Sequence, residues 1–297
     1  MKNKKAFGSI ILLITSIIWG LAFVFQRTGM DKIEPITFNA VRMATGAIFL
    51  GIVILLLNVK RKNTSRASTE NNRKTIIGGL CCGAFLTAAS LAQQIGMVYT
   101  SAGKAGFITA MYILFVPIIN FVIFKKKAAI KVWVAVLIGI LGMYMLCVKE
   151  SFTFAPGDVM ILACAIIFSG HILCVDYFTQ FCNPIKLSAI QFATAAVVST
   201  VFAFIFESPT IEKIISAAIP ILYCGILSGG VGYTLQMVGQ KDTDPAIASL
   251  IMSLESVFAL IAGVLLLGET MTFTEIAGCV VMFAAIVLAQ LPGNKKT

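Results

Sequence analysis

The sequence has few charged residues and a single histidine. Only 12% of its 297 residues are charged, about half the roughly 25% that is usual for soluble domains. With one histidine, His171, and eight cysteines that form no CxxC pair, a metal site is not expected. The HExxH, P-loop and nucleophile-elbow motifs are also missing. We therefore predict no metal, no cofactor and no enzymatic activity.

Apolar residues are in excess, at 59% of the chain with a mean hydropathy of +0.96. Because a membrane span needs about 20 apolar residues, we predict an all-α membrane protein with ten transmembrane helices. The first apolar run, 6–25, is too long for the apolar core of a signal peptide, so we interpret it as the first span. The predicted spans are 6–27, 35–58, 76–98, 103–124, 131–148, 157–179, 184–207, 214–239, 245–267 and 273–291.

The net charge of +10 is concentrated in alternate loops. One set of loops holds most of the lysine and arginine, as at 60–62 and 125–127, whereas the opposite set keeps mainly acids such as Asp31 and Glu34. Since cytoplasmic loops are enriched in Lys and Arg, we predict a multi-pass protein of the cell membrane with both termini in the cytoplasm. The expected partners are the lipid bilayer and a small-molecule substrate, and no nucleic acid. Monomer and dimer remain open.

The chain also repeats itself. PITFNAVRMATG from Pro35 matches PIKLSAIQFATA from Pro184 at a shift of 184 − 35 = 149 residues. A second match has a shift of 142 and pairs Cys82, Gly83 and Gln94 with Cys224, Gly225 and Gln236. Each half, 1–149 and 150–297, then holds five spans. Because five is odd, the second half enters the membrane in the opposite orientation. This inverted-repeat plan is found in many transporters, which handle substrate between their halves.

Three motifs extend this pattern. They are the WG pair of the first span (Trp19 and Gly20), TSAGKAGFITAMY from Thr100, and SLESVFALIAGVLLLGE from Ser253. With ten spans in two halves, they resemble the EamA-type branch of the drug/metabolite transporter superfamily over essentially the whole chain. The resemblance implies secondary transport, usually efflux, of a small metabolite or drug-like compound.

One motif departs from the family. Relatives commonly carry Leu-Glu-Pro where this chain has Leu-Glu-Ser at 254–256, so no proline supports a helix break there. In the first half, Pro117 supplies one, because it lacks the N–H that would bond the carbonyl of Ile113.

Polar residues within the spans are costly unless they face a cavity or a partner. A helix rises about 1.5 Å per residue, which converts sequence position into depth. An outer layer then collects Gln26, Arg42, Gln93, Gln94 and Lys104, and an inner layer collects His171, Asp176, Gln191 and Gln236. Glu255 lies about 15 Å deep, near the midplane. We therefore predict two polar vestibules, one on each side, separated by Glu255.

The charged candidates each have two interpretations. Arg42 and Lys104 fit the binding of an anionic group. Alternatively, Lys104 reaches to the membrane interface and Arg42 pairs with a helix end. Glu255 fits a substrate ammonium or a coupling proton, or an acid hydrogen-bonded between helices. His171 fits a proton relay or a neutral, hydrogen-bonded histidine at the inner mouth.

The uncharged candidates are equally open. The glutamines either line a path or bond between helices, and the tyrosines either wall a pocket or pack. The predicted substrate or pathway residues are Arg42, Gln93, Gln94, Lys104, Tyr112, Gln191, Tyr233, Gln236 and Glu255, with Glu255 and His171 as candidates for proton coupling.

The leading hypothesis is an alternating-access exporter. A small amino-acid-like zwitterion fits a cationic vestibule that faces an acid, and an apolar, drug-like cation is the rival substrate. The alternatives are a membrane enzyme acting on a lipid-linked substrate and a channel. The first would need positioned acid–base groups, and the second a selectivity ring.

Overall fold

The computed structural model describes residues 2–62, 72–99, 102–147, 156–268 and 270–291. Every regular element in these ranges is a helix. The elements are α1 (Lys2–Met30), α2 (Pro35–Lys62), α3 (Asn72–Gly96), α4 (Ala102–Ala110), α5 (Tyr112–Phe124), α6 (Ile130–Cys147), α7 (Pro156–Thr179), α8 (Pro184–Phe206), α9 (Ile211–Ser216), α10 (Ala218–Leu222), the π-helix η1 (Tyr223–Tyr233), α11 (Thr234–Gln240), α12 (Pro245–Met252), α13 (Glu255–Leu267) and α14 (Phe273–Gln290).

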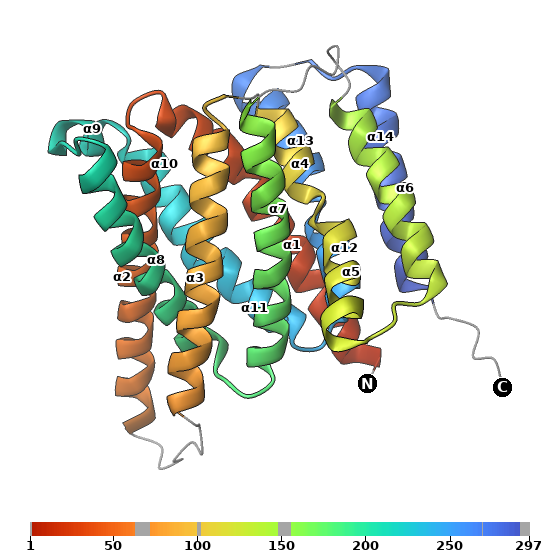
Figure 1. Cartoon of the computed structure of the whole chain (residues 1–297), viewed down its shortest axis with the longest axis horizontal. Coiled ribbons are helices and arrows are strands. Elements are labelled where there is room, and N and C mark those ends of the chain that lie inside the picture. The colour runs from red at the N-terminus through yellow and green to blue at the C-terminus, as the bar shows by residue number, and fades with distance from the viewer. Residues whose placement is uncertain (1, 63–71, 100–101, 148–155, 269, 292–297) are drawn as a thin grey trace.

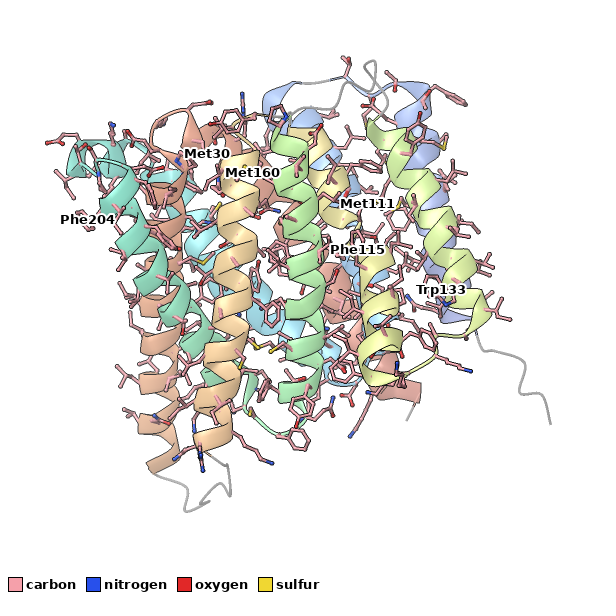
Figure 2. The ribbon with its side chains drawn as sticks, in the orientation of Figure 1. Met30, Met111, Phe115, Trp133, Met160 and Phe204 are labelled. Carbon is pink, nitrogen blue, oxygen red and sulfur yellow. The ribbon has the colours of Figure 1, made fainter. Side chains whose placement is uncertain are left out.

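The membrane-spanning character of these helices is confirmed. Within the described ranges, nine helical segments are long and apolar enough to cross a membrane, and the segment Ile130–Leu146 is apolar but shorter. Large apolar side chains point away from the bundle, as Phe204 does with 72% of its surface exposed (Figure 2). An apolar perimeter of this kind would be unfavourable in water and suits contact with lipid.

Proline opens α2, α7, α8 and α12. The first helical position suits proline, because the N–H there has no partner within the helix and the ring already holds φ near the helical value. The residue before the proline caps two of these helices. The side chain of Asn183 accepts a hydrogen bond from the amide of Ile185 at 3.0 Å, and that of Asp244 accepts one from the amide of Ala246 at 2.9 Å. Local turn chemistry therefore sets where these spans begin.

The helices form one bundle in which α1 begins and α14 ends at the same end (Figure 1). At one edge α2 packs on α8, and at the other edge α6 packs on α14 (Figure 1). Between these edges, α3 packs on α7 and α1 packs on α13. The centre of the bundle is thus built from the first, third, fourth, sixth, eighth and ninth spans.

Equivalent contacts recur in the two halves. A Cβ added at Gly83 of α3 would lie 3.0 Å from the carbonyl oxygen of Gln191 on α8, and one added at Gly225 of η1 would lie 2.8 Å from that of Arg42 on α2. The sequence repeat pairs Gly83 with Gly225 and Arg42 with Gln191. Only glycine lets these backbones approach so closely. The recurrence favours the predicted repeat, while the inverted orientation of the second half stays a prediction.

The fourth span is interrupted at Met111, between α4 and α5 (Figure 2), and not at Pro117. Pro117 lies inside α5, which continues to Phe124. Because α5 starts again at Tyr112, the proline removes only the amide that would bond the Ile113 carbonyl, and the rest of the helix tolerates it. The expected break in the first half therefore exists, but six residues earlier (117 − 111).

The ninth span is also interrupted, at Ser253 and Leu254, although no proline follows. The amide of Leu254 bonds the carbonyl of Ile251 at 3.2 Å, and the amide of Met111 bonds that of Ile108, also at 3.2 Å. Both bonds span three residues, so each break is one tight turn of 3₁₀ type. Ser253 and Met111 are 253 − 111 = 142 residues apart, which makes the two breaks equivalent under the repeat.

The turn between α1 and α2 is tied to the second half of the chain. One carboxylate oxygen of Glu207 accepts a hydrogen bond from the amide of Ile36 at 2.9 Å, and the other accepts from the amide and hydroxyl of Thr37, both at 2.6 Å. Glu207 thereby caps the first turn of α2, where a negative charge is favourable. Nearby, Lys213 donates to Glu34 and lowers the pKa of that carboxyl below its ordinary value.

Replacing Glu207 with Ala should destabilise the protein. The change leaves the first amides of α2 without their acceptor, so we expect a loss of about 1–2 kcal/mol in the free energy of unfolding. Thermal unfolding of the purified protein in detergent measures it. Asp242→Ala, which removes an exposed acid from the turn between α11 and α12, is the matched control and should leave the melting temperature unchanged. Equal melting temperatures for both variants would contradict the cap.

Candidate functional site

A cavity lies between the central helices, with about 510 Å³ of space between atoms, its open mouth included. Its wall is made of polar and aromatic side chains from both halves of the chain. The lining residues are Trp19, Ala22, Phe23, Gln26, Arg42, Gln93, Thr109, Tyr112, Phe168, His171, Ile172, Ser228, Tyr233, Gln236 and Glu255. A concave wall that combines aromatic side chains with a few polar groups is typical of a small-molecule site.

The cavity joins residues that the sequence assigned to separate vestibules. The outer set contributes Arg42 and Gln93, and the inner set contributes His171 and Gln236, on the same wall as Glu255. Depth counted along a helix locates only Cα atoms. Arginine and glutamine side chains are long enough to converge from different depths. These residues therefore line one polar cavity, where two separate vestibules were predicted. Tyr112 and Tyr233 also line it.

Other candidates lie outside the cavity wall. Gln94 is fully buried, and neither end of its amide has a hydrogen-bond partner among the described residues. Gln191 stands behind the wall, against His171. Asp176 lines a second hollow of about 430 Å³, which Lys126 shares. The side chain of Lys104 lies outside the described residues, so its predicted role stays a prediction.

Arg42 is 7% exposed. Its Nε and Nη2 donate to Oδ1 of Asn39 at 3.0 and 2.8 Å, and its guanidinium carbon lies 6.0 Å from the ring centroid of Phe38. Among the described residues, no carboxylate pairs with it. A buried cation without an anion is strongly unfavourable. The arrangement therefore leaves Arg42 able to bind an anionic group that enters the cavity.

Glu255 is 5% exposed and is the first residue of α13. Its Oε1 accepts a hydrogen bond from the hydroxyl of Tyr112 at 3.0 Å. Tyr112 is itself the first residue of α5, so the bond joins the two half-helices that restart after the tight turns. A carboxylate in the first turn of a helix is favoured by the helix dipole. Because the tyrosine hydroxyl is neutral, the site is left able to accept a cation.

His171 is fully buried. Its Nε2 lies 3.0 Å from Oε1 of Gln191, and because that oxygen accepts only, Nε2 carries the hydrogen. Its Nδ1 has no partner among the described residues. A hydrogen-bonded histidine was one of the two interpretations from the sequence, and the contact with Gln191 fits it. The role in proton coupling remains a hypothesis.

Tyr233 is the centre of an aromatic group at the end of η1. Its ring centroid lies 4.7 Å from that of Trp19, 5.4 Å from that of Phe192 and 5.9 Å from the imidazole of His171. The indole nitrogen of Trp19 donates to the carbonyl of Ser228 at 3.1 Å. This bond ties α1 to the π-helix, a rare conformation that is frequent at functional sites.

Sequence reasoning missed three polar residues of the site, Asn39, Thr109 and Ser228. Asn39, which holds Arg42, lies one helical turn before it in the same repeated motif. Thr109 lines the cavity and accepts a hydrogen bond from Nε2 of Gln93 at 3.2 Å. The spacing of three between Asn39 and Arg42 was a usable signal, because such residues are neighbours on a helix. Thr109 lies in the motif TSAGKAGFITAMY, three residues before Tyr112, so its position on the helix was a second signal.

These features define a multi-pass membrane protein with a polar cavity between its halves. The chain belongs to the EamA-like transporter family, whose profile matches residues 6–148 and, separately, 155–291. This confirms the resemblance to the EamA-type branch of the drug/metabolite transporter superfamily. Membership of this family identifies a transporter and speaks against an enzyme.

Curated relatives agree. An uncharacterized transporter of Archaeoglobus fulgidus is 26% identical over 97% of this chain and 87% of its own length. The uncharacterized transporter YoaV of Bacillus subtilis is 26% identical over 93% of this chain and 94% of its own. A solved structure matches with a TM-score of 0.77 and 15% identity, covering 96% of each chain, which supports the fold alone.

Gly20 lets α1 pack closely against α13, the helix that carries Glu255. A Cβ added at Gly20 would lie 2.4 Å from the Cβ of Phe258 and 2.8 Å from the Glu255 carbonyl oxygen. Gly20→Ala should therefore push α1 off α13, with a loss of about 1–3 kcal/mol in the free energy of unfolding. Thermal unfolding in detergent measures it.

Gly51→Ala is the matched control, because a Cβ at Gly51 meets no atom within 4 Å. It should leave the melting temperature unchanged or raise it, since alanine is the better helix former. If Gly20→Ala were as stable as Gly51→Ala, the close contact between α1 and α13 would be wrong.

Proposed function

We propose that this protein is a secondary transporter that exports a small, amino-acid-like zwitterion by alternating access. The observation that carries the proposal is that one cavity holds both Arg42 and Glu255, and neither has an oppositely charged partner among the described residues. The substrate carboxylate would bind the Arg42 guanidinium, and the substrate ammonium would bind the Glu255 carboxylate.

The charge balance favours a zwitterion over the rival substrate. An apolar cation would pair with Glu255 and would suit the aromatic wall around Trp19 and Tyr233, but it would leave Arg42 unpaired. A simple anion would pair with Arg42 but would bring no positive group to Glu255. Because an unpaired buried charge is costly, a solute that carries both charges is the best fit to this cavity.

Alternating access is supported by the paired tight turns at Met111 and Ser253. Each turn lies in a span beside the cavity, and the residues after them, Tyr112 and Glu255, share a hydrogen bond. Short 3₁₀ segments within helices often mark hinges. With the second half inverted, movement at one hinge would open one side of the membrane as the other side closes. Export as the direction follows from the family resemblance alone.

The surroundings complete the proposal. The asymmetry of Lys and Arg between alternate loops supports cytoplasmic termini in the cell membrane. The apolar perimeter supports the bilayer as a partner, and the small cavity supports a small-molecule substrate, with no role for nucleic acid.

Counterflow into proteoliposomes tests the charge pair. The panel is an amino acid, the amine left when its carboxylate is removed, and the acid left when its amino group is removed. Wild-type protein should exchange the amino acid at least about tenfold faster than either analogue, since each missing pair is worth about 1.4 kcal/mol or more. Arg42→Ala should lose the preference over the amine, and Glu255→Gln the preference over the acid.

Two exposed residues of the same types give matched controls. Arg27→Ala and Glu212→Gln should leave every rate unchanged. Unchanged flux in both Arg42→Ala and Glu255→Gln would reject the charge-pair model. Single-channel currents of high unitary rate would favour a channel instead, and turnover of a lipid-linked substrate by the purified protein would favour an enzyme.

A further inference from the structure

Asn39 is fully buried on α2, one helical turn before Arg42. Its side-chain oxygen accepts two hydrogen bonds from the same edge of the guanidinium, from Nε at 3.0 Å and from Nη2 at 2.8 Å. A guanidinium has five N–H donors in a planar fork. These two bonds occupy one side of the fork and leave the end of the group, with Nη1 and the second hydrogen of Nη2, for another acceptor.

The amide nitrogen of Asn39 is held as firmly as its oxygen. Nδ2 donates to Oγ of Ser90 on α3 at 3.2 Å and to Oγ of Ser199 on α8 at 3.0 Å. Both serines are buried, at 1% and 0% exposure. Since the two hydroxyls come from opposite halves of the chain, Asn39 is oriented by both halves. Its oxygen and both amide hydrogens are all used, so the amide has one orientation.

We propose that Asn39 is a positioning residue for substrate recognition, fixing the Arg42 guanidinium by one edge while leaving its end and its charge for the carboxylate of the solute. This inference rests on the proposed function of Arg42. An amide suits the position because it orients the guanidinium without neutralising it. A carboxylate in its place would form an internal ion pair with Arg42. Asn39 thus makes the cavity selective for solutes that carry a carboxylate.

Asn39→Asp is the sharpest test. Aspartate has the same shape, accepts the same two bonds from Arg42, and can accept from the hydroxyls of Ser90 and Ser199, so the variant should fold with a melting temperature at or above that of the wild type. The preference for the amino acid over its amine should fall by at least about tenfold, because the KM for the amino acid rises. Counterflow of the amine should be as fast as in the wild type or faster, because Arg42 is then paired without a carboxylate from the solute.

The matched control is Asn58→Asp, which adds the same charge to an exposed position on the same helix. It should keep the wild-type preference. If Asn39→Asp does not fold, Asn39→Ser is measured in the same way and should also raise the KM for the amino acid, because Arg42 is no longer held. A folded Asn39 variant with the wild-type preference would overturn the proposal.

A second readout separates this proposal from the proposed function. Butanedione modifies accessible arginines, and mass spectrometry reports its reaction at Arg42, with the exposed Arg27 as an internal reference. The open end of the guanidinium should react in the wild type and several-fold more slowly in Asn39→Asp. If the wild type shows no preference for a carboxylate but this slowing occurs, the proposed substrate is wrong and the positioning by Asn39 stands. Equal reaction in both proteins, or none at Arg42 in the wild type, would refute the positioning.

Discussion

The structure depends on how a charge is kept inside an apolar bundle. Arg42 and Glu255 are both buried, and the side chains that hold them, Asn39 and Tyr112, are neutral. Neutral partners orient a charged group but do not cancel its charge. A solute bound in the cavity can supply the counter-charge that is missing. A polar cavity between apolar helices is the consequence, and the close contact at Gly20 holds α1, which contributes Trp19 to the cavity wall, against α13.

The site is built where two helices stop and start again. Tyr112 and Glu255 are the first residues after repeat-equivalent tight turns. Each turn changes the direction in which the next side chain points, and that side chain faces the cavity. In a continuous helix, the helical period alone would set this direction. The same turns are the points at which the fourth and ninth spans can bend with least loss of hydrogen bonds. Binding and movement would therefore be linked through one hydrogen bond, that between Tyr112 and Glu255.

Much of this could be predicted from the sequence. Hydropathy predicted the spans, because apolar runs of about 20 residues are typical of membrane helices and rare in soluble domains. The cost of polar groups in lipid identified Arg42 and Glu255. Three features could not be predicted. Tight turns of 3₁₀ type have no residue signature, so the sequence placed the break of the fourth span at Pro117 although it lies at Met111. Depth along a helix ignores side-chain length, so one cavity was interpreted as two. The partners Ser90 and Ser199 of Asn39 come from other helices, and contacts between distant helices cannot be found in one sequence.

The most direct test is whether a transported solute protects a residue of this cavity from chemical labelling. Thr109 lines the cavity at 2% exposure, and Thr109→Cys in a background without the native cysteines places a single thiol there. A thiol reagent is added to proteoliposomes with and without a solute that supports counterflow. We predict that the solute slows labelling of this thiol in proportion to its occupancy. Labelling at the same rate with and without a saturating, transported solute would contradict binding in this cavity.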